Sequence, residues 1–292
     1  MTVLSRRGVM VADLLELTKP RIVVMVMITA AAGFWLAGPE VWQVMVHFHL
    51  LFGTMLIAAG TNALNQVAER DIDARMRRTR NRPLPAGRLD PTVATVFAGG
   101  LGVSGALYLA TFVNALTAAL AAATLVTYVF LYTPLKRRTS LSTLVGGVPG
   151  ALPIVGGWTA VSGTIDPATI VLFWIMFLWQ LPHFLALGWI YRDDYAGAGF
   201  SMLSNNDPDG RLTFAHATQY AAALVPVSLL PSFMGIGGTV YFVVALILSS
   251  IFLMMSIGAL RSRTVANASR LFRFSLLYLP ILLFVMVLDH TL

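Results

Sequence analysis

Long stretches without charge are the feature that most limits how this chain folds. Residues 91–135 and 212–260 run for 45 and 49 residues without one Asp, Glu, Lys or Arg. A helix needs about 20 apolar residues to cross the hydrocarbon core of a bilayer, so each run is long enough for two crossings. Of the 292 residues, 11% are charged, against roughly 25% in a soluble domain. We therefore expect an all-α, polytopic integral membrane protein.

The uncharged runs predict nine transmembrane helices. The two longest runs are expected to fold back near residues 111–115 and 231–238. Five further segments supply one span each, namely residues 22–39, 41–68, 139–165, 167–191 and 271–288. Residues 1–19 are charged and lack the apolar core of a cleavable signal, so they are expected to form a short cytoplasmic segment. We expect residues 1–292 to form a single membrane domain.

The distribution of basic residues supports the count of nine. All 20 Lys and Arg fall at the N-terminus or in the second, fourth, sixth and eighth connections. The odd connections and the C-terminal end hold only three charged residues, Glu40, Asp166 and Asp289. Because Lys and Arg concentrate in cytoplasmic loops, this predicts a cytoplasmic N-terminus and an outer C-terminus. The membrane is expected to be the cell membrane of a prokaryote, and the net charge of +7 needs no nucleic acid as partner.

The densest charge lies in residues 62–88, directly after the second span. This stretch holds seven of the twenty basic residues and three of the thirteen acids. Asn65, Glu69 and Asp73 are spaced i, i+4, i+8, so they stack on one face if the helix continues through them. Such oxygen ligands suit Mg²⁺, and the neighbouring guanidinium groups suit phosphate. The alternative is a solvated helix end whose arginines only set topology.

A second acidic group follows the sixth span on the same side of the membrane. Asp193 and Asp194 stand at the end of a predicted helix, where acids oppose the macrodipole. This placement favours metal ligands over a simple turn, and the two acidic groups together are expected to clamp one substrate. Lys136 and Arg137 follow the fourth span, and they fit equally a topology signal or the neutralisation of a diphosphate.

Three side chains in the sixth span indicate a cavity inside the bundle. Trp179, Gln180 and His183 lie at membrane depth beside Pro182. A lone histidine is usually a satisfied polar contact, but this group beside a proline kink is typical of an internal cavity. We expect His183 to contact a ligand there, with a bound iron as one candidate. The absence of cysteine means that any metal in this chain is held by oxygen or nitrogen.

Several blocks of sequence follow one another along nearly the whole chain. They are Leu17-Thr-Lys-Pro-Arg, Asn62-x-x-Asn65-Gln66-x-x-Glu69-x-x-x-Asp73, Met76-x-Arg78-Thr79-x-x-Arg82-Pro83-Leu84-Pro85-x-Gly87, Tyr132-Thr133 with Leu135-Lys136-Arg137, Gly156-x-Trp158, Trp179-Gln180-x-Pro182-His183-Phe184, and Asp194-Tyr195-x-x-Ala198-Gly199 with Met202-Leu203. In these blocks the chain resembles the UbiA-type superfamily of intramembrane prenyltransferases and, within it, the heme O synthases. It departs from the superfamily pattern in having Glu69 where Asp is usual, and in having its second pair of acids adjacent rather than spaced.

The resemblance implies a nine-helix bundle around a central cavity and an enzyme that transfers a farnesyl group from farnesyl diphosphate to a vinyl group of heme B. Mg²⁺ is the implied cofactor. Heme B, farnesyl diphosphate and the lipid bilayer are the implied partners. The product, heme O, is expected to pass to a heme A synthase or a terminal oxidase assembly.

The resemblance also assigns roles to individual residues. The catalytic, metal-binding end is expected to use Asn65, Glu69, Asp73, Asp193 and Asp194, with Asn65, Glu69, Asp73 and Asp194 as metal ligands. The diphosphate is expected to lie among Arg78, Arg82, Lys136 and Arg137. The cavity for heme and the prenyl chain is expected to be lined by Asn62, Tyr128, Trp179, Gln180, His183 and Tyr195.

Two other functions fit the same chain less well. A related enzyme that prenylates a quinone precursor such as 4-hydroxybenzoate would share the charged motifs, but the Trp-Gln-x-Pro-His-Phe block favours heme. A heme or lipid transporter would also use nine spans with buried polar groups. Transporters commonly show an inverted repeat and need no one-sided metal site, which favours the enzyme.

Overall fold

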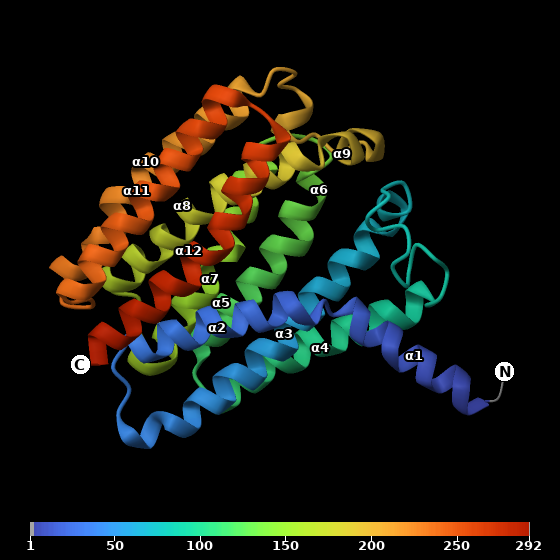
Figure 1. The fold of residues 1–292 in the computed structure, drawn as a ribbon. Helices are drawn as coiled ribbons and strands as arrows, with labels where there is room; N and C mark the ends of the chain where they lie inside the picture. The colour runs from blue at the N-terminus through green and yellow to red at the C-terminus, as the bar shows by residue number, and fades with distance from the viewer. Residues whose placement is uncertain (1–2, 292) are drawn as a thin grey trace.

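The computed structural model describes residues 3–291, and this part of the chain contains helices and connections but no strand (Figure 1). The predicted all-α class is confirmed. The α-helices in chain order are α1 (Val3–Leu17), α2 (Pro20–Leu36), α3 (Val44–Asp73), α4 (Pro91–Phe112), α5 (Ala115–Val126), α6 (Thr133–Leu135), α7 (Ser142–Ser162), α8 (Pro167–Ile190), α9 (Arg192–Ala198), α10 (Arg211–Phe233), α11 (Thr239–Ser262) and α12 (Val265–Thr291).

Most of these helices are membrane spans. Between residues 3 and 291, seven helical segments are long and apolar enough to cross a bilayer. An eighth is formed if Met10–Leu17 and Pro20–Leu36 are one span bent by 45°. The helix α10 is 23 residues long and packs against α8 and α11, although Thr213, His216 and Gln219 make it more polar than its neighbours. By length and composition the described residues therefore support seven or eight spans, which is close to the predicted nine but does not confirm that count.

The two longest uncharged runs fold back where the sequence predicts. The first turns at Val113 and Asn114, and the Asn114 side chain caps α5 by accepting a hydrogen bond from the backbone N–H of Thr117 at 2.8 Å. Such a cap satisfies a donor that the first turn of a helix cannot pair internally. The second turns between α10 and α11, where Gly235 adopts a φ of 72° that glycine tolerates without strain.

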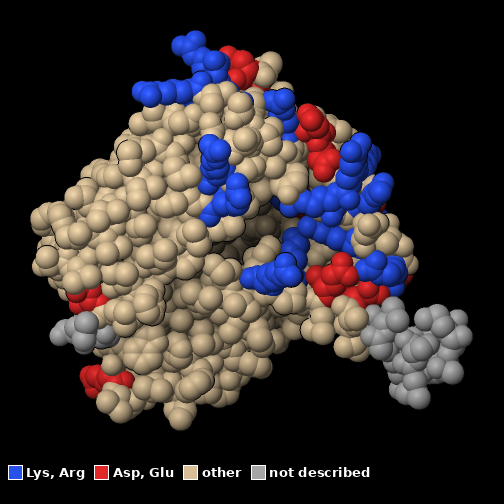
Figure 2. All heavy atoms as spheres, in the orientation of Figure 1, with Lys and Arg blue, Asp and Glu red and all other residues tan. Residues whose placement is uncertain are grey.

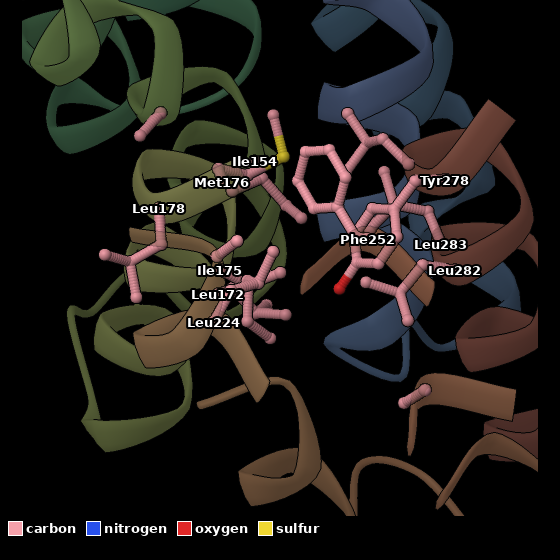
Figure 3. Packing of buried hydrophobic residues seen from close by; sticks show 14 of the residues in the cluster. Ile154, Leu172, Ile175, Met176, Leu178, Leu224, Phe252, Tyr278, Leu282 and Leu283 are labelled. Atoms are coloured by element: carbon pink, nitrogen blue, oxygen red, sulfur yellow. The ribbon is translucent and has the colours of Figure 1, made fainter. Parts of the chain in front are cut away.

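The main apolar core holds α7, α8, α10, α11 and α12 together (Figure 3). Ile154, Leu172 and Leu224 bring three of these helices into one cluster and are at most 1% exposed. Phe252 of α11 and Tyr278 of α12 stack with ring centroids 5.3 Å apart. Within a bilayer such contacts are stabilised by van der Waals packing rather than by removal of apolar area from water, because lipid tails are as apolar as these side chains. This core fixes α8 against α12, which matters for the site described below.

Close backbone contact joins α2 to α7. A Cβ on Gly157 would overlap the carbonyl oxygen of Ala30, and a Cβ on Gly33 would overlap that of Ile154. Small residues let two helices approach until their backbones touch, as is usual in membrane bundles. The neighbouring Gly156 is different, because a Cβ there would meet nothing within 4 Å.

Charged side chains gather at one end of the bundle. Figure 2 shows Lys and Arg along the edge where α6, α9 and the connection after α3 lie in Figure 1, and none around the C-terminus. The same face is deeply hollowed at its centre, between the paths of α12 and α2, with basic side chains at the rim (Figure 2). The charged end and the hollow therefore open on the same part of the surface.

The glycine contact gives a matched pair of variants. Gly157→Ala is expected to lower the free energy of unfolding by about 1–3 kcal/mol, because the added methyl group forces α2 away from α7. Gly156→Ala should leave it nearly unchanged. Thermal unfolding of the two purified variants in the same detergent measures the difference, and equal midpoints would show that the two helices are not in backbone contact.

Candidate functional site

The C-terminal half of α3 carries five buried polar side chains. These are Asn62, Asn65, Gln66, Glu69 and Asp73, and none is more than 6% exposed. The helix continues without a break through Asp73, so Asn65, Glu69 and Asp73 lie on one face as their spacing predicts. Buried polar groups are costly unless they are paired, so the surrounding chain has to supply partners.

Three basic side chains from three different segments supply those partners. The Nζ of Lys136 donates to Oε1 of Glu69 at 2.7 Å. The Nη1 of Arg82 donates to Oδ2 of Asp73 at 2.6 Å. The Nζ of Lys19 donates to Oδ1 of Asn65 at 2.9 Å. One helix face thus draws together the start of α2, the connection after α3 and the end of α6.

The connection after α3, residues 74–90, is held at both of its ends. Near its start, the hydroxyl of Thr79 donates to the carbonyl oxygen of Asp73 at 2.8 Å. At its far end, Arg88 donates to Asp13 at 2.8 Å and to Glu16 at 2.7 Å, both on α1. Its turns are closed by backbone hydrogen bonds and contain no helix, because Pro83 and Pro85 disfavour helical continuation. These anchors position Arg82 beside Asp73.

A π-helical stretch, Thr127–Tyr132, brings a second layer of contacts to the site. Directly after it, the hydroxyl of Thr133 accepts from Nδ2 of Asn65 at 3.0 Å and donates to the carbonyl oxygen of Tyr128 at 2.8 Å. Single π-helical turns inside a helix are frequent at functional sites, because they redirect the side chains that follow. Here the π-helical stretch ends at Tyr132, and the Nζ of Lys136, four residues later, lies over the ring of Tyr132 at 4.5 Å from the ring centre.

The cluster holds three basic side chains and two carboxylates. Burial disfavours a charged Lys136, but Tyr132 and Glu69 outweigh that effect and raise its pKa above the ordinary value, so it is cationic at neutral pH. Lys136 and Arg82 pair with the carboxylates of Glu69 and Asp73. Burial and the neighbouring Arg82 and Lys136 lower the pKa of Lys19 to about 7, so it is only partly charged at neutral pH. A bound anion would favour its charged form, which suits this cluster to an anion.

In the second acidic loop, Tyr195 contacts Arg78 of the connection after α3. Tyr195 is 8% exposed, and its hydroxyl lies 3.4 Å from Nη2 of Arg78. The Arg78 guanidinium also lies 5.0 Å from the ring centre of Tyr191. Cations over aromatic faces are attracted to the ring electrons, so these contacts tie Arg78 to the second loop.

The acids of this loop lie differently. Asp193 is almost fully exposed and lies 3.7 Å from Arg192, while Asp194 is half-buried and forms no hydrogen bond or ion pair with α3 in residues 3–291. Within the same range, no three His, Asp or Glu side chains form a metal-holding group. The structure therefore brings Asn65, Glu69 and Asp73 together but does not add Asp193 or Asp194 to them. Arg137 is exposed, and its carbonyl oxygen accepts from Ser201.

The polar side chains predicted on α8 lie against α7 and α12. Gln180 donates to the carbonyl oxygen of Gly147 at 2.7 Å. Trp179 donates through Nε1 to the carbonyl oxygen of Ser275 at 2.9 Å, and Nδ1 of His183 lies 2.7 Å from the hydroxyl of Ser275. The rings of Trp179 and His183 are 5.5 Å apart. They form a separate group on the same bundle.

Three residues of the site escaped the sequence analysis. Lys19 belongs to the Leu17-Thr-Lys-Pro-Arg block and to the one-sided charge pattern, but neither assigns it a role in the site. Its backbone has a φ of 53°, which is unusual outside glycine and is concentrated at functional sites. Thr133 and Ser275 are single hydroxyl residues in apolar helices, where many such residues only bond their own backbone. The Lys-Pro pair that opens α2 was the one available signal, since the residue before proline is kept out of helical geometry.

Comparison with known proteins shows the family to which this chain belongs. The model of the UbiA prenyltransferase family matches residues 26–279. The chain belongs to the UbiA prenyltransferase family. It is 43% identical over 287 residues to a protein from Solibacter usitatus named protoheme IX farnesyltransferase, covering 95% of this chain and 98% of that one. It is 44% identical over 280 residues to a protein of the same name from Salinibacter ruber, covering 96% and 99%.

Solved structures of the family share the fold. A structure described as digeranylgeranylglyceryl phosphate synthase in membranes superposes with a TM-score of 0.81 at 18% identity, covering 96% of this chain and 98% of that chain. A UbiA homologue from Archaeoglobus fulgidus, bound to GPP and Mg²⁺, superposes with a TM-score of 0.68 at 13% identity, covering 94% and 99%. The expectation of a UbiA-type membrane fold is thereby confirmed.

The buried pair of Glu69 and Lys136 can be tested apart from any activity. Glu69→Gln is expected to lower the free energy of unfolding by about 3–5 kcal/mol, because it leaves a buried ammonium group without a counter-charge. Adding Lys136→Met should recover most of that loss. Arg70→Gln breaks an exposed pair with Asp71 and should cost less than about 1 kcal/mol.

Unfolding of Glu69→Gln, Lys136→Met, the double variant and Arg70→Gln in mixed detergent provides the measurement. Strictly additive effects of Glu69→Gln and Lys136→Met would mean that the two side chains do not interact in the folded protein.

Proposed function

We propose that this protein transfers the farnesyl group of farnesyl diphosphate to a vinyl group of heme B and so makes heme O. The observation that carries the proposal is the 43% identity, over almost the full length of both chains, to a protein named protoheme IX farnesyltransferase. The family assignment favours this enzyme over a transporter. The names of the relatives favour heme over a quinone precursor as the acceptor.

The residues at the end of α3 fit Mg²⁺ and a diphosphate. Asn65, Glu69 and Asp73 offer the oxygen donors that Mg²⁺ prefers, and they come from one rigid helix face. Bound there, Mg²⁺ would neutralise charge on the diphosphate and make it a better leaving group. A related protein has been solved with GPP and Mg²⁺, which supports the same pair of ligands here.

The protein's own cations stabilise the leaving group. If Glu69 and Asp73 held metal, Lys136 and Arg82 would be free to donate to diphosphate oxygens, and Lys19 would be free if Asn65 also turned its oxygen to the metal. Arg78, tied to the second loop through Tyr195, would close on the same anion from the other side. Negative charge that develops on the departing oxygen is thus stabilised by nearby hydrogen-bond donors. In many enzymes such electrostatic stabilisation of the transition state is the largest contribution to the rate.

The reaction then breaks the C1–O bond, the π bond of the vinyl group and an O–H bond of water, and it forms a C–C bond and a C–O bond. The C1–O bond of farnesyl diphosphate breaks, with its electron pair going to the diphosphate, and leaves an allylic cation. The π electrons of a heme vinyl group form the new C–C bond, and water adds to the resulting cation and loses a proton. The rings of Tyr128 and Tyr132, 5.0 Å apart beside Lys136, would shield the allylic cation from early capture by water.

The protein is a multi-pass membrane protein, and we propose that its charged end is cytoplasmic. All basic residues lie at the N-terminus or in even-numbered connections, which supports that orientation. Farnesyl diphosphate and heme B would then enter from the cytoplasmic side or from the bilayer. A heme A synthase or terminal oxidase assembly as the receiver of heme O stays a prediction.

The activity is tested by incubating membranes with heme B and farnesyl diphosphate. The porphyrin should gain the mass of a farnesyl group plus a hydroxyl group, and EDTA should abolish the gain. Asp73→Ala should reduce the rate at least about 100-fold, since it removes a metal ligand and unpairs Arg82. Asp71→Ala, two residues earlier but exposed, should retain the wild-type rate. A gain of mass that survives EDTA, or full activity in Asp73→Ala, would contradict the assignment of the metal site.

The absence of cysteine makes the orientation easy to measure. Val41→Cys, in the exposed connection between α2 and α3, should react with an impermeant maleimide added outside intact cells. Arg138→Cys, exposed after α6, should react only after the membrane is opened. The reverse pattern would place the charged end outside the cell.

A further inference from the structure

Ser275 connects α12 to the two aromatic side chains that α8 turns toward it. It is completely buried. Its carbonyl oxygen accepts from Nε1 of Trp179 at 2.9 Å, and its hydroxyl lies 2.7 Å from Nδ1 of His183. The hydroxyl also donates to the carbonyl oxygen of Phe272 at 2.6 Å, one turn earlier in α12. One residue therefore holds both side chains to the neighbouring helix.

The hydroxyl proton of Ser275 determines the state of the histidine. A serine has one O–H, and here it is used on the carbonyl oxygen of Phe272. The Ser275 oxygen can then only accept from His183, so the histidine must carry its proton on Nδ1. In a neutral imidazole the other nitrogen, Nε2, is then a lone-pair acceptor.

The ring of His183 is also fixed in orientation. Its centroid lies 4.7 Å from that of Phe272 and 5.5 Å from those of Trp179 and Phe184. The side chain is half-buried, and no hydrogen bond to Nε2 is formed within residues 3–291. A histidine with a purely structural role would be expected to use both nitrogens or to bury the second one. Here one nitrogen is held and the other is left available.

We propose that Ser275 is a positioning residue, which fixes His183 in the Nδ1–H tautomer so that Nε2 binds the iron of heme B. The proposal rests on the proposed function, because it takes heme B as the substrate. A histidine that ligates a metal through one nitrogen almost always donates from the other to an oxygen, which fixes its tautomer and raises its basicity. Ser275 provides that oxygen from a rigid helix, and iron ligation would set where the reacting vinyl group lies.

The test measures heme binding rather than turnover. Purified protein in detergent is titrated with ferric heme B, and the absorption and electron paramagnetic resonance spectra are recorded. Wild-type protein should show a histidine-bound iron, and His183→Ala should lose that signature. Ser275→Ala should weaken the histidine-bound form about tenfold, because the imidazole is no longer held in one tautomer. Ser275→Thr keeps the hydroxyl and should restore it.

A matched control separates positioning from loss of stability. Ser256 is equally buried, and its hydroxyl donates to the carbonyl oxygen of Phe252 without contacting a histidine. Ser256→Ala should bind heme as the wild type does. Wild-type binding without a histidine signature, unchanged binding in Ser275→Ala, or an equal loss in Ser256→Ala would each overturn the proposal. Failure of the proposed function would appear separately, as wild-type membranes that bind heme B but add no farnesyl group to it.

Discussion

The pairing of buried charge at the end of α3 is the constraint on which the arrangement of the charged end depends. Glu69 and Asp73 are buried where a long membrane helix leaves the apolar region, and uncompensated carboxylates there would be very costly. Lys136 and Arg82 form ion pairs with them from segments far apart in the sequence. The turn after α3, the end of the fourth span and the start of α2 are therefore fixed relative to one another before any ligand is present.

The same cluster suits the binding of an anion together with a cation, as we propose. Three basic groups meet two carboxylates, so neither a metal alone nor a diphosphate alone restores balance in the way that both together do. A diphosphate with Mg²⁺ satisfies the carboxylates and the cations at once. The group of side chains that we propose to hold heme is separate, on α8 and α12, and the apolar core between those helices holds it in place. In this proposal the leaving group and the acceptor are held by different elements of one rigid bundle.

Periodicity and charge predicted more of the fold than of the site. The fold-back points at Asn114 and Gly235 and the stacking of Asn65, Glu69 and Asp73 follow from run length and helical spacing, which are local properties. Local properties do not decide which of several neighbouring charged residues faces inward. Asp193 and Arg137 are exposed although their motifs place them near the substrate. Lys19, which no motif assigned to the site, turns into the cluster, because tertiary packing selects among neighbouring charges of equal spacing.

The most direct test of this account is a binding titration with farnesyl thiodiphosphate, a substrate analogue that reacts too slowly to be consumed. Calorimetry should show tight binding that requires Mg²⁺, and Lys136→Gln should weaken it about tenfold to a hundredfold, as expected for loss of a hydrogen bond from a charged group. Glu69→Gln should remove most of the dependence on Mg²⁺. Binding of equal strength with and without Mg²⁺, unaffected by both substitutions, would contradict the assignment of this cluster as the diphosphate site.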